Sequence, residues 1–112
     1  KIVLTGYTLG SNGAWHLAAH YPDRFSAVIP LAAHPPLDLI DRLTDLPIFV
    51  IHSLADEQVP IEPTNKMVRI LQNRGAPVQY LVVDDITHHQ TTRFRDHLKS
   101  TIPWLKKIWR TE

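Results

Sequence analysis

The 112-residue sequence contains no cysteine, which excludes a disulfide framework and a thiol nucleophile and leaves the redox compartment open. It also lacks an excess of one charge, with 12 Lys and Arg against 11 Asp and Glu. This balance argues against binding to nucleic acid or to an anionic membrane surface. Its apolar runs are only as long as strands, so no transmembrane span is expected. The remaining composition, 44% hydrophobic and 21% charged, is typical of a globular domain.

An initiator methionine and a signal peptide are also missing from the start, where the chain opens into an apolar run at Ile2. We interpret residues 1–112 as a single domain. We expect it to be either a trimmed chain or the C-terminal part of something longer.

Four short apolar segments are expected to be strands: 2–5, 27–31, 48–52 and 78–83. Three are nearly continuous in apolar character, which is typical of parallel strands covered on both faces, while Gln79 indicates an edge strand or a half-covered strand for the fourth. Helical patterns cover 12–20, 62–74 and 91–110, with Pro103 starting a new turn or a kink, and a short helical turn covers 39–43. This alternation predicts the α/β class, with about four parallel strands and helices on both faces. Functional residues should then follow the carboxyl ends of the strands.

The first strand leads into Gly6-Tyr7-Thr8-Leu9-Gly10, the G-x-S-x-G nucleophile elbow with threonine in place of serine. Such a turn is tight, and we expect Gly6 and Gly10 to provide space for it. The strained turn would lift the Thr8 hydroxyl over the sheet, and the amide of Leu9 would receive a developing oxyanion. The alternative is a glycine-containing turn that only packs.

Acidic and histidine candidates follow later strands. Asp56 comes shortly after the third strand, and His88 and His89 come after the fourth. The order nucleophile, acid, histidine is the one expected for α/β-hydrolases. Asp56 could instead be a turn residue, and Asp84 and Asp85 are weaker acid candidates because turn aspartates are common after strands.

Several segments resemble the α/β-hydrolases of the phospholipase/carboxylesterase group, which includes feruloyl-esterase-like enzymes. They are the elbow with Asn12-Gly13-Ala14-Trp15, segments 21–25 and 28–32, the acid-loop segment 51–60, and Thr87-His88 followed by 102–105. The resemblance implies hydrolysis of a small carboxylic ester by Thr8, Asp56 and His88, with His88 preferred to His89. It implies no metal or organic cofactor, and a bacterial protein of either cytoplasmic or secreted location.

The sequence departs from that group in two ways. Thr8 stands where the group has serine, and its β-branched side chain in a strained elbow should cost about 1–3 kcal/mol. Ser11, where the group commonly has glycine, is a milder change. The resemblance also covers only the C-terminal half of the fold, so one oxyanion donor would be absent, a loss of about 10²–10³ in rate.

A half-fold would leave the first strand as an apolar sheet edge, which predicts homo-oligomerisation or docking of a missing N-terminal segment. A monodisperse monomer in sizing with light scattering would count against this. The competing hypothesis is a catalytically silent pseudo-hydrolase that acts as a scaffold or interaction module. A third possibility is that Thr8 is an engineered replacement in an active serine enzyme.

Two other histidine features favour structural roles. His16 and His20 have the i, i+4 spacing of metal ligands, but no third ligand is apparent, so we predict no metal site. His52 ends a strand and is interpreted as a packed or hydrogen-bonded structural residue.

Overall fold

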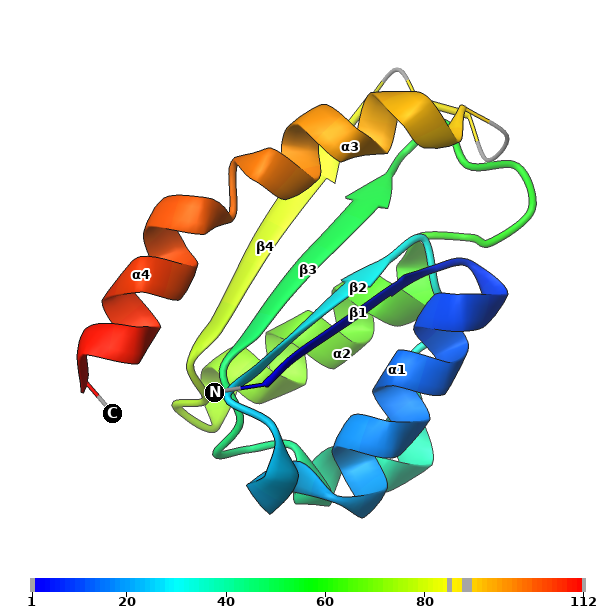
Figure 1. Ribbon diagram of the computed structural model, residues 1–112. Coiled ribbons are helices and arrows are strands. Elements are labelled where there is room, and N and C mark those ends of the chain that lie inside the picture. Colours follow the sequence, from blue (N-terminus) through cyan, green and yellow to red (C-terminus); the bar gives the residue numbers. More distant parts are fainter. Residues whose placement is uncertain (1, 85, 88–89, 112) are drawn as a thin grey trace.

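The computed structural model describes residues 2–84, 86–87 and 90–111. Its centre is a fully parallel four-stranded sheet, as predicted, and the strand order is β1-β2-β3-β4. The strands are β1 (Val3–Tyr7), β2 (Ala27–Leu31), β3 (Ile48–Ser53) and β4 (Val78–Val83). Their carboxyl ends meet at one edge of the sheet, toward the upper right of Figure 1. We call this edge the rim.

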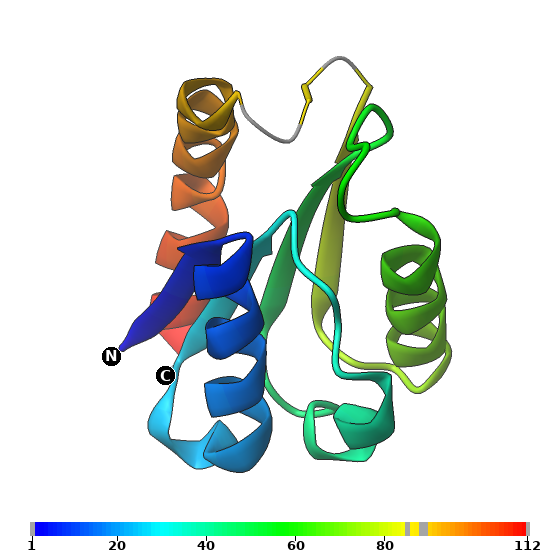
Figure 2. The ribbon, with the colours of Figure 1, turned by 90° about the vertical axis from the view of Figure 1, so that its right-hand side faces the viewer.

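The helices follow the predicted alternation with small shifts. The α-helices are α1 (Leu9–His20), α2 (Glu62–Asn73), α3 (Thr91–Lys99) and α4 (Ile102–Thr111), and the 3₁₀ turns are η1 (Pro22–Arg24) and η2 (Leu37–Arg42). The predicted last helix is divided in two, with Pro103 in the first turn of α4, where its missing N–H leaves no helical hydrogen bond unmade. Figure 2 shows α1, η2 and α2 on one face of the sheet and the α3–α4 pair on the other.

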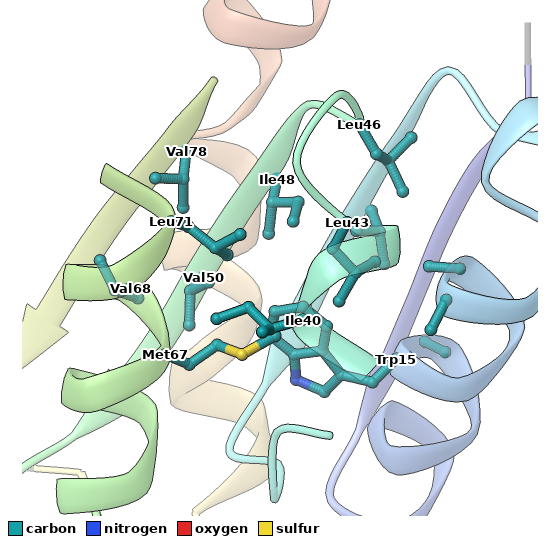
Figure 3. Packing of buried hydrophobic residues seen from close by; sticks show 14 of the residues in the cluster. Trp15, Ile40, Leu43, Leu46, Ile48, Val50, Met67, Val68, Leu71 and Val78 are labelled. Atoms are coloured by element: carbon teal, nitrogen blue, oxygen red, sulfur yellow. The ribbon is translucent and has the colours of Figure 1, made fainter. Parts of the chain in front are cut away.

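Both faces of the sheet carry an apolar core, which explains the unbroken apolar runs of the central strands. Along β3, Ile48 and Val50 face the core beneath α1, η2 and α2, whereas Phe49 and Ile51 face the core beneath α3 and α4. Figure 3 shows the first core, where Trp15 of α1 reaches toward Ile40 and Met67. Every residue of β2 is buried, as expected for a strand covered on both faces.

The two outer strands differ from this pattern. β4 is the last strand in the order and has exposed positions at Gln79 and Val82, so the prediction of an edge or half-covered strand is confirmed. β1 forms the opposite edge; none of its residues is fully buried, and the preceding Ile2 is 58% exposed. Among the described residues, no helix is both long enough and apolar enough to cross a membrane.

Candidate active site

The junction between β1 and α1 has an unusual backbone. Thr8, the residue between strand and helix, has φ 49° and ψ −111°. A positive φ is uncommon outside glycine, and for a β-branched residue it is a strained conformation of order 1–3 kcal/mol. This is the strained turn that the elbow pattern predicts.

Close packing across the turn accounts for one of its two glycines. A Cβ atom placed on Gly6 would lie 2.5 Å from the backbone carbonyl carbon and oxygen of Gly10, closer than real contacts allow. Only glycine therefore fits at position 6. A Cβ on Gly10 would meet nothing within 4 Å, so the expectation that Gly10 is also needed for space is wrong for the described residues. Gly10 lies on the exposed side of the first turn of α1.

Two hydrogen bonds to the end of β2 fix the elbow. The Thr8 amide donates to the Leu31 carbonyl at 3.1 Å, and the Leu31 amide donates to the Ser11 hydroxyl at 2.9 Å. Ser11 is fully buried, so its hydroxyl accepts this hydrogen bond away from solvent. In sequence Ser11 is only a mild departure from glycine, and this role is not predictable there because its partner, Leu31, lies 20 residues away.

Leu9 opens α1, three residues earlier than the predicted helix start at Asn12. Its side chain is 79% exposed, and its backbone amide is one of the first N–H groups of the helix, which have no acceptor within the helix. An oxyanion beside Thr8 would meet this amide and the positive end of the helix dipole.

Asp56 lies in the loop after β3, and its side chain is fully buried. Its Oδ1 accepts hydrogen bonds from the amides of Gln58 at 3.0 Å and Val59 at 2.8 Å. The alternative interpretation as a turn aspartate is therefore correct for Oδ1. This turn is also compatible with an orienting role for the carboxylate. The two hydrogen bonds to Oδ1 hold the whole group, and so they also fix the position of Oδ2.

His52 is buried beneath this loop, and the prediction of a hydrogen-bonded structural histidine is confirmed. Its Nε2 lies 2.9 Å from the Val59 carbonyl oxygen, and its Nδ1 lies 3.0 Å from the Thr64 hydroxyl. Its side chain is 1% exposed, so it cannot reach a substrate at the rim.

The elbow and the acid loop share the rim. β1 and β3 are separated by β2, so their ends lie two strand spacings apart, about 10 Å. One imidazole with a hydrogen bond of about 3 Å on each side can span such a gap. Burial raises the pKa of the Tyr7 phenol, and the negative charges of Asp56 and Glu57 raise it further. The carboxylates of Asp56 and Glu57 are therefore close enough to Tyr7, the last residue of β1, to interact with it electrostatically.

The predicted base, His88, lies outside the described residues, as do its alternative His89 and the weaker acid candidate Asp85. Their neighbours are described. Ile86 is buried in the core beneath α3, and the Thr87 amide donates to the Gln90 side-chain oxygen at 2.8 Å. Asp84 is exposed.

An apolar pocket of about 330 Å³ adjoins the elbow on the α3 face. It is lined by Tyr7, Leu31, Phe94, Arg95 and Leu98.

Within the described part of the chain, no three acidic or histidine side chains are grouped closely enough to hold a metal ion. The rings of His16 and His20 stack on each other, with centroids 6.2 Å apart.

Comparison with known proteins assigns the chain to a family. The profile of the prolyl oligopeptidase family matches residues 32–111, well over half of the chain. A protein of Aquifex aeolicus named "Putative carboxymethylenebutenolidase" is 29% identical over 89 residues, which cover 79% of this chain and 38% of that protein.

Solved structures show the fold to which the chain is similar. The crystal structure of a thermostable esterase is 30% identical, with a TM-score of 0.72 over 76% of this chain and 23% of the esterase. Esterase PE8 matches with a TM-score of 0.76 and 20% identity over 95% of this chain and 49% of its own. The chain thus spans half or less of each of these relatives. It has the fold of an α/β-hydrolase, as the sequence resemblance implied, and it belongs to the prolyl oligopeptidase family.

Proposed function

We propose that this chain carries the catalytic rim of an acyl hydrolase that cleaves small carboxylic esters, with Thr8 as nucleophile, His88 as base and Asp56 as the orienting acid. The observation that carries the proposal is the φ of 49° at Thr8. A β-branched residue keeps such a backbone only where the surrounding structure imposes it, and retained strain of this kind clusters at active sites.

The proposed reaction has two steps. The Thr8 Oγ1 attacks the ester carbonyl carbon while His88 takes the hydroxyl proton, and the amide of Leu9 stabilises the resulting oxyanion. The carbon–oxygen bond to the alcohol then breaks, and His88 returns the proton to the leaving alcohol. Water, deprotonated by His88, attacks the acyl-threonine ester, and the carboxylic acid leaves as Thr8 is regenerated.

Asp56 would hold His88 in the required orientation and stabilise the imidazolium that forms in each step. Its own fixation by the Gln58 and Val59 amides supports this role, because an orienting carboxylate must itself be held. The pocket beside Tyr7 and Leu31 has apolar walls and the size for a short acyl chain, which makes p-nitrophenyl butyrate a suitable probe.

The test compares wild type with Thr8→Ser and Thr8→Ala in the release of p-nitrophenol from this ester. We expect Thr8→Ser to exceed wild type, because serine lacks the methyl group that strains the elbow and crowds the attacking oxygen, and Thr8→Ala to fall to the level of buffer. His88→Ala should match Thr8→Ala. A serine variant no faster than the alanine variant would refute the proposed nucleophile.

The family match gives a specific reason to test amide cleavage as a second candidate, since the family is named for an oligopeptidase. The matched probe is butyryl-p-nitroanilide, which has the same acyl group and an amine leaving group. Preference for the anilide over the ester would replace the esterase proposal by a peptidase one.

The exposed edge of β1 is also a proposed site for pairing with a second copy or with a further segment of the same fold.

A further inference from the structure

His52 is the buried titratable group nearest to the proposed acid that the proposed reaction does not use. Its Nε2 lies 3.8 Å from the Asp56 Oδ2, beyond hydrogen-bond distance, and both side chains are buried. The nearer contact of Nε2 is the Val59 carbonyl oxygen at 2.9 Å. The direct contact between the two side chains is therefore electrostatic, and the hydrogen-bonded route between them passes through Val59.

The peptide groups of Val59 connect the two residues. The Val59 amide donates to the Asp56 Oδ1 at 2.8 Å, and the Val59 carbonyl accepts from His52. A shift of the Val59 backbone would move the carboxylate, because Oδ1 is hydrogen-bonded to it. Holding the carbonyl end of Val59 therefore helps to hold the amide end, and with it Asp56.

The contacts also fix the tautomer of His52. A carbonyl oxygen can only accept, so the hydrogen between His52 and Val59 must reside on Nε2. In the neutral ring Nδ1 is then an acceptor, and it faces the Thr64 hydroxyl at 3.0 Å. The other acceptor near that hydroxyl, the Ala33 carbonyl, lies at 3.5 Å. The Val59 carbonyl thus selects the Nε2–H tautomer, and the Thr64 hydroxyl, which lies nearer to Nδ1 than to the Ala33 carbonyl, completes the link between the start of α2 and the acid loop.

We propose that His52, held as the Nε2–H tautomer between the Val59 carbonyl and the Thr64 hydroxyl, is a positioning residue for the Asp56 carboxylate. This inference rests on the proposed function for the role of Asp56, but its structural part does not depend on hydrolysis. In this proposal His52 does not touch the substrate, and its hydrogen-bonded link to Asp56 runs through the Val59 backbone.

The first experiment reads the tautomer directly, by long-range ¹H–¹⁵N NMR correlation of histidine-labelled protein at pH 8, with His52→Gln used to assign the signal. We expect Nε2 to carry the hydrogen and Nδ1 to be the bare nitrogen. The reverse assignment would overturn the proposal, because a bare Nε2 cannot donate to Val59. This reading needs no catalytic activity.

The second experiment measures amide hydrogen exchange at Val59 in three variants. His52→Leu removes the donor, and we expect exchange at least about tenfold faster. In His52→Gln the amide nitrogen can replace Nε2 and the amide oxygen can replace Nδ1, so exchange should stay near wild type. The matched control is His16→Leu, the same change at an exposed histidine of α1. Unchanged exchange at Val59 in a folded His52→Leu protein would contradict the proposal.

The third readout is kinetic and uses the ester of the preceding section. His52→Leu should lower kcat by about 10–10²-fold with KM unchanged, as expected for a misplaced catalytic group, and His52→Gln should restore most of it. A loss confined to KM would contradict a positioning role. If neither wild type nor Thr8→Ser hydrolyses the ester, the proposed function fails, while the tautomer and exchange measurements still decide the role of His52. If His52→Leu does not fold, the role of His52 is decided by the tautomer of the wild-type protein and by Val59 exchange in His52→Gln.

Discussion

The ends of β1 and β3 lie on the same rim but are held in different ways. In the loop after β3, Asp56 and Val59 are buried and are joined with His52 by hydrogen bonds, whereas Leu54, Glu57 and Gln58 are exposed. The elbow after β1 is partly exposed, lies on an edge strand and contains a strained residue, Thr8. The acid side of the rim is thus held by hydrogen bonds between the loop after β3 and the end of β3 itself. The nucleophile side depends on close packing at one glycine and on two hydrogen bonds to β2.

The largest effect is expected from filling the tight side of the elbow. Gly6→Ala would place a Cβ 2.5 Å from backbone atoms of Gly10, which are not free to move as a flexible side chain is. We expect the free energy of unfolding to fall by about 3 kcal/mol or more. Urea denaturation measures it.

The control for this change is Gly10→Ala, where the added Cβ meets nothing within 4 Å. Alanine also favours a helix more than glycine does, so stability should be unchanged or rise by up to about 1 kcal/mol. Equal losses in the two variants would show that the elbow is not limited by the contact at Gly6.

Asp56 allows the structural and catalytic roles of the acid loop to be separated. Asp56→Ala leaves the amides of Gln58 and Val59 without their acceptor, and we expect a loss of about 1–3 kcal/mol in unfolding free energy. Asp56→Asn keeps a carbonyl oxygen for these amides and should lose much less stability. Both variants should lose ester hydrolysis, because neither has the negative charge that stabilises the imidazolium.

The matched control for this pair is Asp84→Asn, at the exposed end of β4. It should change neither stability nor hydrolysis. Full ester hydrolysis by Asp56→Asn would leave Asp56 as a turn residue only.

The strain at the elbow should appear as a substitution that stabilises the fold. Thr8→Gly removes the side chain that disfavours φ 49°, and we expect unfolding free energy to rise by about 1 kcal/mol after the entropy loss of glycine is included. Thr5→Gly is the matched control within β1, where the Thr5 hydroxyl donates to the Ile29 carbonyl at 2.6 Å. It should lower stability by about 1 kcal/mol. Two losses of similar size would mean that Thr8 is not strained.

The parts of the molecule that the sequence predicted are those with a local signal. The apolar runs predicted all four strands because both faces of the sheet are covered. The start of α1 was placed three residues late because Leu9-Gly10-Ser11 has no helical apolar stripe. The hydrogen bonds of Ser11 to Leu31 and of His52 to Thr64 form only when folding brings the partners together, so no local sequence pattern predicts these pairs.

The site itself was predictable only in part. Strand ends indicated the rim, and the glycine pattern indicated the strained residue, so Thr8 and Asp56 were placed on the correct elements. The choice of His88 over His89 stays a prediction. Sequence spacing could not distinguish the two, since they are adjacent and follow the same strand.

The smallest expected effect concerns β4, at the other end of the sheet from the elbow. Burial, with a further contribution from the charge of Glu62, raises the pKa of Tyr80 to about 12, and its hydroxyl donates to the Asn65 side chain at 2.6 Å. An unfolded tyrosine titrates near 10, so between about pH 10 and 12 the unfolded state loses a proton that the native state keeps. Stability should therefore fall as pH rises through this window.

Tyr80→Phe should remove much of that dependence of stability on pH, leaving the part due to Tyr7, whose pKa is also raised. Glu62→Gln should reduce the slope less, because burial is the larger cause. Chemical denaturation at a series of pH values measures all three, and an unchanged slope in Tyr80→Phe would show that the Tyr80 phenol titrates alike in both states.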